Sequence, residues 1–135
     1  MITTIIFDCG EVLVRGMYGA DEPIALLVGR SKQHVWKRLN SWPKNQMFCG
    51  WMTERRYWEV LIEENGWSCT PQQLETMIRQ NFTEVPGTRP IIEKLRQTGY
   101  KMGMLWVHAR EWIEYCQAKH QYHHLLKLLQ LKHHL

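Results

Sequence analysis

Two short apolar runs flank a long stretch with helical periodicity. Residues 2–7 are continuously apolar and β-branched, which predicts a strand buried on both faces, as in a parallel sheet. Residues 100–107 predict a second strand, preceded by a helix over 88–97 and followed by one over 109–119. The order strand, helical stretch, helix, strand, helix predicts an α/β fold with a helical insertion after its first strand.

Capping signals mark the helices of the insertion. Ser31 and Thr53 can each cap a helix, and Asn65-Gly66 ends the second. Thr70-Pro71 predicts a third start, while residues 41–50, which contain Pro43, predict a connection. Five tryptophans are expected mainly to fill the core of this lobe, with one or two facing a substrate as the alternative: Trp36, Trp42, Trp51, Trp58 and Trp67.

Composition narrows the class of protein. The 135 residues carry a net charge of +4, with lysine and arginine interleaved with glutamate, which argues against a nucleic-acid-binding surface. No apolar stretch reaches the roughly 20 residues that a membrane span needs. The four cysteines form no CxxC pair, and the first residues do not look like a signal peptide, so we expect a reduced, cytoplasmic protein.

Asp8 is the first candidate for chemistry. It ends the first predicted strand and is followed by a glycine turn, where α/β sheets place their ligands. A carboxylate there can attack a phosphoryl or carbon centre and form a covalent intermediate. The alternative is that Asp8 is only a turn or capping residue.

The segment around Asp8 resembles a known motif. Residues 5–14, Ile-Ile-Phe-Asp-Cys-Gly-Glu-Val-Leu-Val, resemble the first motif of the haloacid dehalogenase (HAD) superfamily, and residues 88–105 resemble the helix and strand that lead into its second. The resemblance covers roughly residues 1–124. It implies a Rossmann-like core with an incomplete parallel sheet, made of residues 1–15 and 86–135, and a helical cap at 16–85.

The resemblance also implies a function: hydrolysis, most often of a small phosphorylated molecule, through an aspartyl intermediate with Mg²⁺. Asp8 would be the nucleophile and a metal ligand, and the backbone carbonyl of Gly10 a second ligand. Many relatives carry at position 10 an aspartate that transfers protons, so the glycine alters that route. Glu11 is a weaker substitute, because its longer side chain starts from another position in the turn.

The second motif is altered. The family ends this strand with serine or threonine, whose hydroxyl contacts the phosphoryl group, but this chain has Trp106. An indole is large enough to occupy the phosphate pocket, or it packs in the core, and phosphate binding suffers either way. His108 follows and can either donate to an anion or begin the next helix.

The later motifs are missing. The chain has only two aspartates, Asp8 and Asp21, so it lacks the family's later acidic pair that holds the metal. Nothing around Lys127 or Lys132 resembles the family's lysine loop. The sequence therefore predicts an apparently truncated HAD-like hydrolase of the phosphatase type that is impaired or inactive, with doubtful Mg²⁺ binding.

The last twenty residues leave several hypotheses open. Cys116 and His120 could share a helix face in a metal site, joined by His123 or His124. The leucine-rich segment could be an amphipathic helix that meets a membrane or a partner, or residues 125–131 could take the place of the family's third strand. Further leucines and histidines lie close to the end: Leu125, Leu126, Leu128, Leu129, Leu131, His133, His134 and Leu135.

A non-catalytic alternative stands beside the hydrolase. In it, the chain is a remnant core that binds a partner or an anion through its cap and its leucine- and histidine-rich tail. In the family's sheet order the first strand is central, and its second neighbour comes from sequence that this chain lacks. We therefore expect self-association through the exposed edge of residues 2–7 or through the tail.

Overall fold

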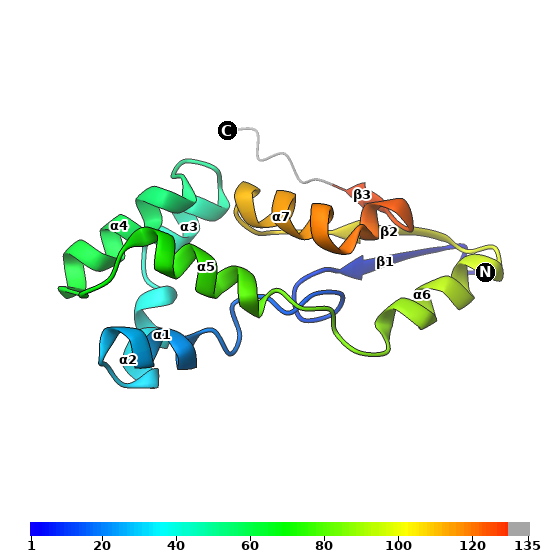
Figure 1. The fold of residues 1–135 in the computed structure, drawn as a ribbon. Helices are drawn as coiled ribbons and strands as arrows, with labels where there is room; N and C mark the ends of the chain where they lie inside the picture. The colour runs from blue at the N-terminus through cyan, green and yellow to red at the C-terminus, as the bar shows by residue number, and fades with distance from the viewer. Residues whose placement is uncertain (130–135) are drawn as a thin grey trace.

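The computed structural model describes residues 1–129 and shows a mixed α/β arrangement (Figure 1). Five helices gather toward one end of the molecule, and a small sheet with two more helices forms the other. The elements in chain order are β1 (Thr4–Asp8), α1 (Asp21–Val28), α2 (Lys32–Leu39), α3 (Pro43–Phe48), α4 (Glu54–Asn65), α5 (Pro71–Asn81), α6 (Thr88–Gln97), β2 (Lys101–Leu105), α7 (Arg110–His120), η1 (Tyr122–His124) and β3 (Lys127–Leu129).

The sheet is parallel, with the order β1-β2-β3. Asp8 lies opposite Leu105, so β1 and β2 end at the same edge. The α/β fold with an incomplete parallel sheet is confirmed, and the backbone of β3 lies within the segment expected for a third strand. Five residues named in the predictions for the tail lie outside the described residues: Leu131, Lys132, His133, His134 and Leu135.

The expectation that β1 is buried on both faces is wrong for the described residues. Within residues 1–129 β1 pairs only with β2, and the side chain of Ile6 is 57% exposed. An apolar run predicts a strand that needs cover, but it cannot say whether the same chain supplies that cover. Thus β1 is an edge strand here.

The helical block, as we call α1–α5, begins its helices where the capping signals predict. Ser31 and Thr53 each accept a hydrogen bond from a backbone amide of the first turn. Thr70 forms a full capping box with Gln73. The predicted connection at residues 41–50 is wrong, because Pro43 opens α3 at a position where proline suits a helix.

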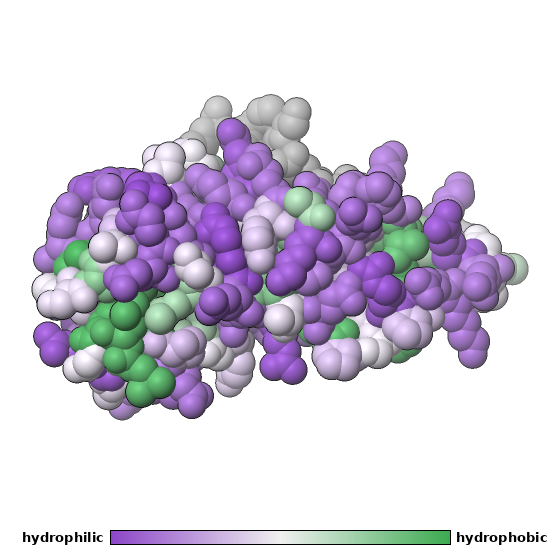
Figure 2. All heavy atoms as spheres, viewed as in Figure 1, coloured by the Kyte–Doolittle hydropathy of each residue, from purple (hydrophilic) through white to green (hydrophobic). Residues whose placement is uncertain are grey.

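The interior of the helical block is only partly as predicted. Trp58 and Trp67 are buried, but Trp42 and Trp51 are exposed. Figure 2 shows a largely hydrophilic face, with an apolar area over the end where α1 and α2 lie. Leu26 of α1 is 83% exposed. Of the five tryptophans predicted mainly to fill the core, Trp42 and Trp51 therefore do not.

A buried ion pair joins α4 to α5. The carboxylate of Glu54 accepts hydrogen bonds from both terminal nitrogens of Arg79, at 2.8 and 2.6 Å, and from the indole of Trp58 at 3.2 Å. Glu54 itself is almost fully buried. Because every hydrogen-bonding oxygen has a partner, the charge can be buried without being left uncompensated.

The two segments that connect the helical block to the sheet run side by side. After β1 the chain turns tightly, and the carbonyl of Cys9 accepts hydrogen bonds from the amides of Val12, Leu13 and Val14. Leu13 then accepts from Val85 at 2.9 Å, and the Arg15 amide donates to Thr83 at 2.8 Å. These bonds fix the turn that follows Asp8.

In the described part of the chain, every helix is too short or too polar to cross a bilayer.

Candidate functional site

Asp8 faces an open depression at the carboxyl end of the sheet. The depression has a volume of about 580 Å³. We call it the Asp8 depression, and it is lined by Ile6, Asp8, Gly10, Glu11, Leu105, Val107 and His108. Asp8 is exposed, and within residues 1–129 its carboxylate forms no hydrogen bond or ion pair. The carboxylate is therefore available to a ligand, which is more than a turn or cap residue requires.

Glu11 lies in the same depression, but its carboxylate is engaged. The residue has a left-handed backbone, with φ of 62°, which turns the chain sharply after Gly10. One carboxylate oxygen accepts a hydrogen bond from the Gly16 amide at 2.8 Å. The side chain thus closes its own turn, and this contact argues against Glu11 as a substitute for the acid–base residue at position 10.

Trp106 is buried in the core, with 6% of its surface exposed, and it is not among the residues that line the depression. The indole therefore does not fill the space next to Asp8. Its N–H donates instead to Nδ1 of His108 at 2.9 Å. No hydroxyl stands at the end of β2, as the sequence indicates, but the depression remains open.

His108 stands over the glycines of the first motif. Atoms Cε1 and Nε2 of its ring lie 3.4 Å from the position that a Cβ of Gly10 would take, and 3.2 and 3.4 Å from that of Gly16. A larger residue at position 16 would force the imidazole or Glu11 to move. Glycine at position 16 therefore leaves the space that the imidazole of His108 and the carboxylate of Glu11 occupy.

Aromatic rings from two helices hold the imidazole in place. Phe48 of α3 lies 5.4 Å and Trp112 of α7 lies 5.9 Å from its centroid. Burial lowers the pKa of His108 to about 4; the negative charge of Asp8 opposes this shift and the positive charge of Lys44 adds to it. The ring is thus neutral at pH 7, and α3 brings both Phe48 and Lys44 toward the end of the sheet.

The described residues fit a full Mg²⁺ site poorly. The resemblance places Asp8 and the Gly10 carbonyl as ligands, and no group of three or more His, Cys, Asp or Glu side chains within residues 1–129 could hold a metal ion. Mg²⁺ prefers octahedral oxygen coordination, commonly with one or two carboxylates and the phosphate of the substrate. Asp8 is the one carboxylate in the depression that is not engaged within the turn.

The predicted Cys116–His120 metal pair is disfavoured, because Cys116 is buried and His120 has another partner. Burial raises the pKa of the Cys116 thiol to about 12, so the thiolate that binds metals is scarce at pH 7. His120 lies 2.6 Å through Nε2 from the carbonyl of Phe82. Cys116 is thus part of the buried core, and His120 contacts the segment that leads from α5 to α6.

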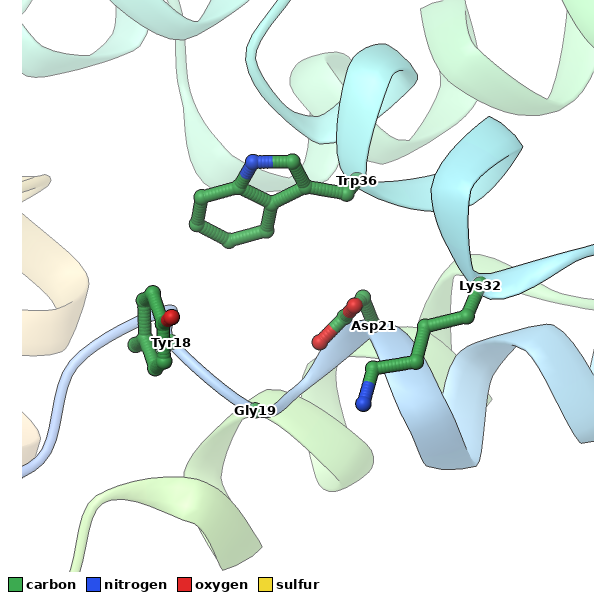
Figure 3. A pocket seen from close by; sticks show the side chains of 5 residues that line it. All are labelled: Tyr18, Gly19, Asp21, Lys32 and Trp36. Carbon is green, nitrogen blue, oxygen red and sulfur yellow. The ribbon is translucent and has the colours of Figure 1, made fainter.

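A second, smaller pocket of about 170 Å³ lies where the segment before α1 meets α1 and α2 (Figure 3). Tyr18, Gly19, Asp21, Lys32 and Trp36 line it, and the rings of Tyr18 and Trp36 meet edge to face at 5.6 Å. Asp21 is buried, and Lys32 forms an ion pair with Glu22 at 3.4 Å. A carboxylate and an ammonium group in one pocket favour neither sign of ligand charge.

Comparisons with known proteins were made by sequence and by structure. No protein-family model matches the sequence, and no curated protein matches it. The structure is similar to L-2-haloacid dehalogenase from Xanthobacter autotrophicus, with TM-score 0.58 and 19% identity over 95% of this chain and 56% of that one. This chain has a HAD-like fold.

Two further solved HAD structures are similar to this chain. A beta-phosphoglucomutase candidate from Thermotoga maritima gives TM-score 0.56 and 14% identity over 98% of this chain and 62% of that one. The HAD-hydrolase candidate YfnB from Bacillus subtilis, bound to magnesium, gives TM-score 0.57 and 15% identity over 96% of this chain and 65% of that one. The chain thus spans less than two thirds of the length of these HAD proteins.

The Trp106–His108 pair could not be predicted from the HAD resemblance. The sequence shows a histidine two residues after the altered position and makes His108 a candidate anion donor, but the hydrogen bond between the two rings depends on their rotamers. Nor does the sequence show that Glu11 folds back onto Gly16, because this contact follows from the left-handed backbone of Glu11.

Proposed function

We propose that this chain is a HAD-type hydrolase of the phosphatase type with impaired turnover. The observation that carries the proposal is the position of Asp8, exposed at the carboxyl end of β1 and facing an open depression. Asp8 is the proposed nucleophile, and a small phosphorylated molecule is the proposed ligand. Residues 16–85 are the proposed cap, and residues 1–15 and 86–135 together are the proposed core.

The proposed impairment follows from what surrounds Asp8. A phosphoryl group brings negative charge next to a carboxylate, and oriented positive charge or donors must offset it. Within residues 1–129 the depression contains no lysine or arginine, and Glu11 is engaged with Gly16. Gly10 supplies no acid for the leaving group. Each such loss typically costs on the order of 10²-fold or more in rate.

With the groups described, Asp8 can form the proposed aspartyl intermediate, but no free base is present to hydrolyse it. Its carboxylate oxygen would attack phosphorus and the leaving oxygen would depart with the electron pair, which requires a proton from solvent. Hydrolysis of the acyl phosphate would then need a water molecule activated by a base. The described residues around Asp8 offer no carboxylate for this second step except the engaged Glu11.

The test is the hydrolysis of p-nitrophenyl phosphate by the purified chain with and without Mg²⁺, beside the variant Asp8→Asn. We expect turnover close to that of the variant. Robust Mg²⁺-dependent turnover that Asp8→Asn abolishes would contradict the impairment. Trp106→Ser should not restore turnover, because the carboxylates remain absent, and its activity and Mg²⁺ affinity are measured in the same assay.

The apolar wall of the depression favours a second candidate, displacement of halide at carbon. Ile6, Leu105 and Val107 contribute that wall, and an apolar pocket suits a carbon centre better than a phosphate. One solved structure similar to this chain is the Xanthobacter L-2-haloacid dehalogenase with chloropropionic acid covalently bound. Release of chloride from 2-chloropropionate that depends on Asp8 would support this candidate over the phosphatase.

The non-catalytic alternative makes a different prediction. A remnant that acts through its cap and tail would show no Asp8-dependent release of phosphate or chloride and no binding of phosphate next to Asp8. Phosphate that binds and shifts the amide signals of Gly10 and His108 would favour the hydrolase-derived site even where turnover is absent.

A further inference from the structure

The contact between Trp106 and His108 determines which imidazole nitrogen carries the proton. An indole N–H can donate a hydrogen bond but cannot accept one. Because Nε1 of Trp106 lies 2.9 Å from Nδ1 of His108, Nδ1 must be the acceptor. A neutral imidazole that accepts at Nδ1 carries its proton at Nε2. Trp106 therefore selects one tautomer of His108.

The protonated edge of the ring lies on the side of the Asp8 depression. Atom Nε2 is 3.4 Å from the position above Gly10 where a Cβ would stand, and His108 lines the depression together with Asp8 and Gly10. The rings of Phe48 and Trp112 pack against the imidazole and restrict its rotation. A fixed N–H thus lies beside Gly10 in the depression that Asp8 also lines.

We propose that Nε2–H of His108 donates a hydrogen bond to an oxyanion bound next to Asp8, with Trp106 as the residue that positions it. The inference rests on the proposed function for its ligand class, phosphate and phosphate monoesters. His108 keeps its proton throughout and acts as a neutral donor. The low pKa of its buried ring agrees with this role, because a neutral ring retains the lone pair at Nδ1 that Trp106 requires.

In this proposal, His108 replaces the hydrogen-bond donor that the altered second motif lacks. The hydroxyl that the resemblance leads one to expect at position 106 would be a donor, and here the donor is supplied two residues later by a ring that Trp106 orients. A hydrogen bond to a charged acceptor is about twice as strong as one between neutral groups. The buried tryptophan and the histidine then form one unit.

The first part of the test reads the tautomer directly in the full chain. Long-range proton–nitrogen spectra of the ¹⁵N-labelled protein should show His108 protonated at Nε2. In Trp106→Phe, which keeps an aromatic ring but lacks the N–H, the ring should populate both tautomers. A wild-type ring protonated at Nδ1 would overturn the inference whatever the protein binds.

The second part measures the affinity for inorganic phosphate by NMR titration, with and without Mg²⁺. His108→Ala should weaken binding about tenfold or more, as expected for the loss of one hydrogen bond to a charged group. His108→Gln, whose amide can donate from a similar distance, should retain most of the affinity. His123→Ala, at an exposed histidine of η1, is the matched control and should match the wild type.

The outcomes separate this inference from the proposed function. Equal phosphate affinity in the wild type and in His108→Ala overturns the role of His108 and leaves the Asp8 site standing. A wild-type chain that does not bind phosphate overturns both the ligand class and the inference. Turnover in the aryl phosphate assay bears on the proposed impairment alone.

Discussion

In the helical block, Trp58, Leu61 and Ile78 are fully buried, whereas in the sheet Ile6 of β1 is 57% exposed. Both regions contain strongly apolar segments, but within residues 1–129 β1 has a neighbouring strand on one side alone. Helices can bury one apolar stripe against neighbours that follow closely in sequence. A central strand of a parallel sheet needs two neighbouring strands and cover on both faces.

This difference in burial predicts that substitutions in the two regions affect stability differently. In the helical block, local signals such as the capping box of α5 and the Glu54–Arg79 pair act within one helix or between adjacent helices. The sheet depends on contacts between segments almost one hundred residues apart, since Asp8 pairs with Leu105. Ile6 of this strand also lines the Asp8 depression.

The largest expected effect probes the closed interior of the helical block. Trp58→Ala removes a fully buried indole and should lower the free energy of unfolding by about 3–5 kcal/mol. Trp51→Ala is the matched control: its side chain is 57% exposed, and we expect a change within about 0.5 kcal/mol. Urea denaturation measures both, and equal losses would mean that the helical block has no distinct core.

A pH titration of stability probes the junction between the helical block and the sheet. The pKa of His108 is about 4 in the fold, against 6.5 for an unperturbed histidine, so the unfolded chain binds the extra proton more readily. The stability from this residue is fully present above about pH 6.5 and falls as the pH approaches 4, by up to about 3 kcal/mol. Asp8 and Lys44 are the charged groups that act on the ring.

His108→Gln provides the control for that titration. The glutamine does not titrate, so the difference in unfolding free energy between the two proteins should change between pH 6.5 and 4 and be constant above that range. A difference that does not depend on pH would show that His108 is readily protonated in the fold and that Phe48 and Trp112 do not shield it.

A smaller effect probes the local signals of the helical block. Thr70→Ala removes the side-chain acceptor of the capping box of α5 and should cost about 1 kcal/mol. Thr76→Ala, on the exposed surface of the same helix, should change stability by less than about 0.5 kcal/mol. Denaturation midpoints compare the two variants, and a Thr70 variant as stable as wild type would show that packing alone sets the start of α5.

Local features were the more predictable part of the molecule. Ser31, Thr53 and Thr70 cap helices as their types and positions predict, and the apolar runs mark β1 and β2. The position of Asp8 at a strand end also followed from the pattern. The exposure of Ile6 could not be predicted from the apolar run alone, because the cover of a strand depends on residues distant in sequence or supplied by another segment.

The site was predictable only in part for a related reason. The altered position at Trp106 was visible in the sequence, but an indole can fill a pocket or turn into the core. The choice depends on His108, which accepts the indole hydrogen bond, and on the space above Gly10 and Gly16. Such choices depend on packing between segments, and residue types alone do not determine them.

Within residues 1–129 β1 is an uncovered edge of the sheet, and sizing by light scattering at micromolar concentration tests this most directly. An exposed apolar edge is a template for pairing with another chain, so we expect self-association. Ile6→Lys, which adds charge to the edge, should shift the chain toward monomer, while Leu26→Lys, at an exposed leucine of α1, should not. A wild-type chain that is a stable monomer with cooperative thermal unfolding would contradict the claim.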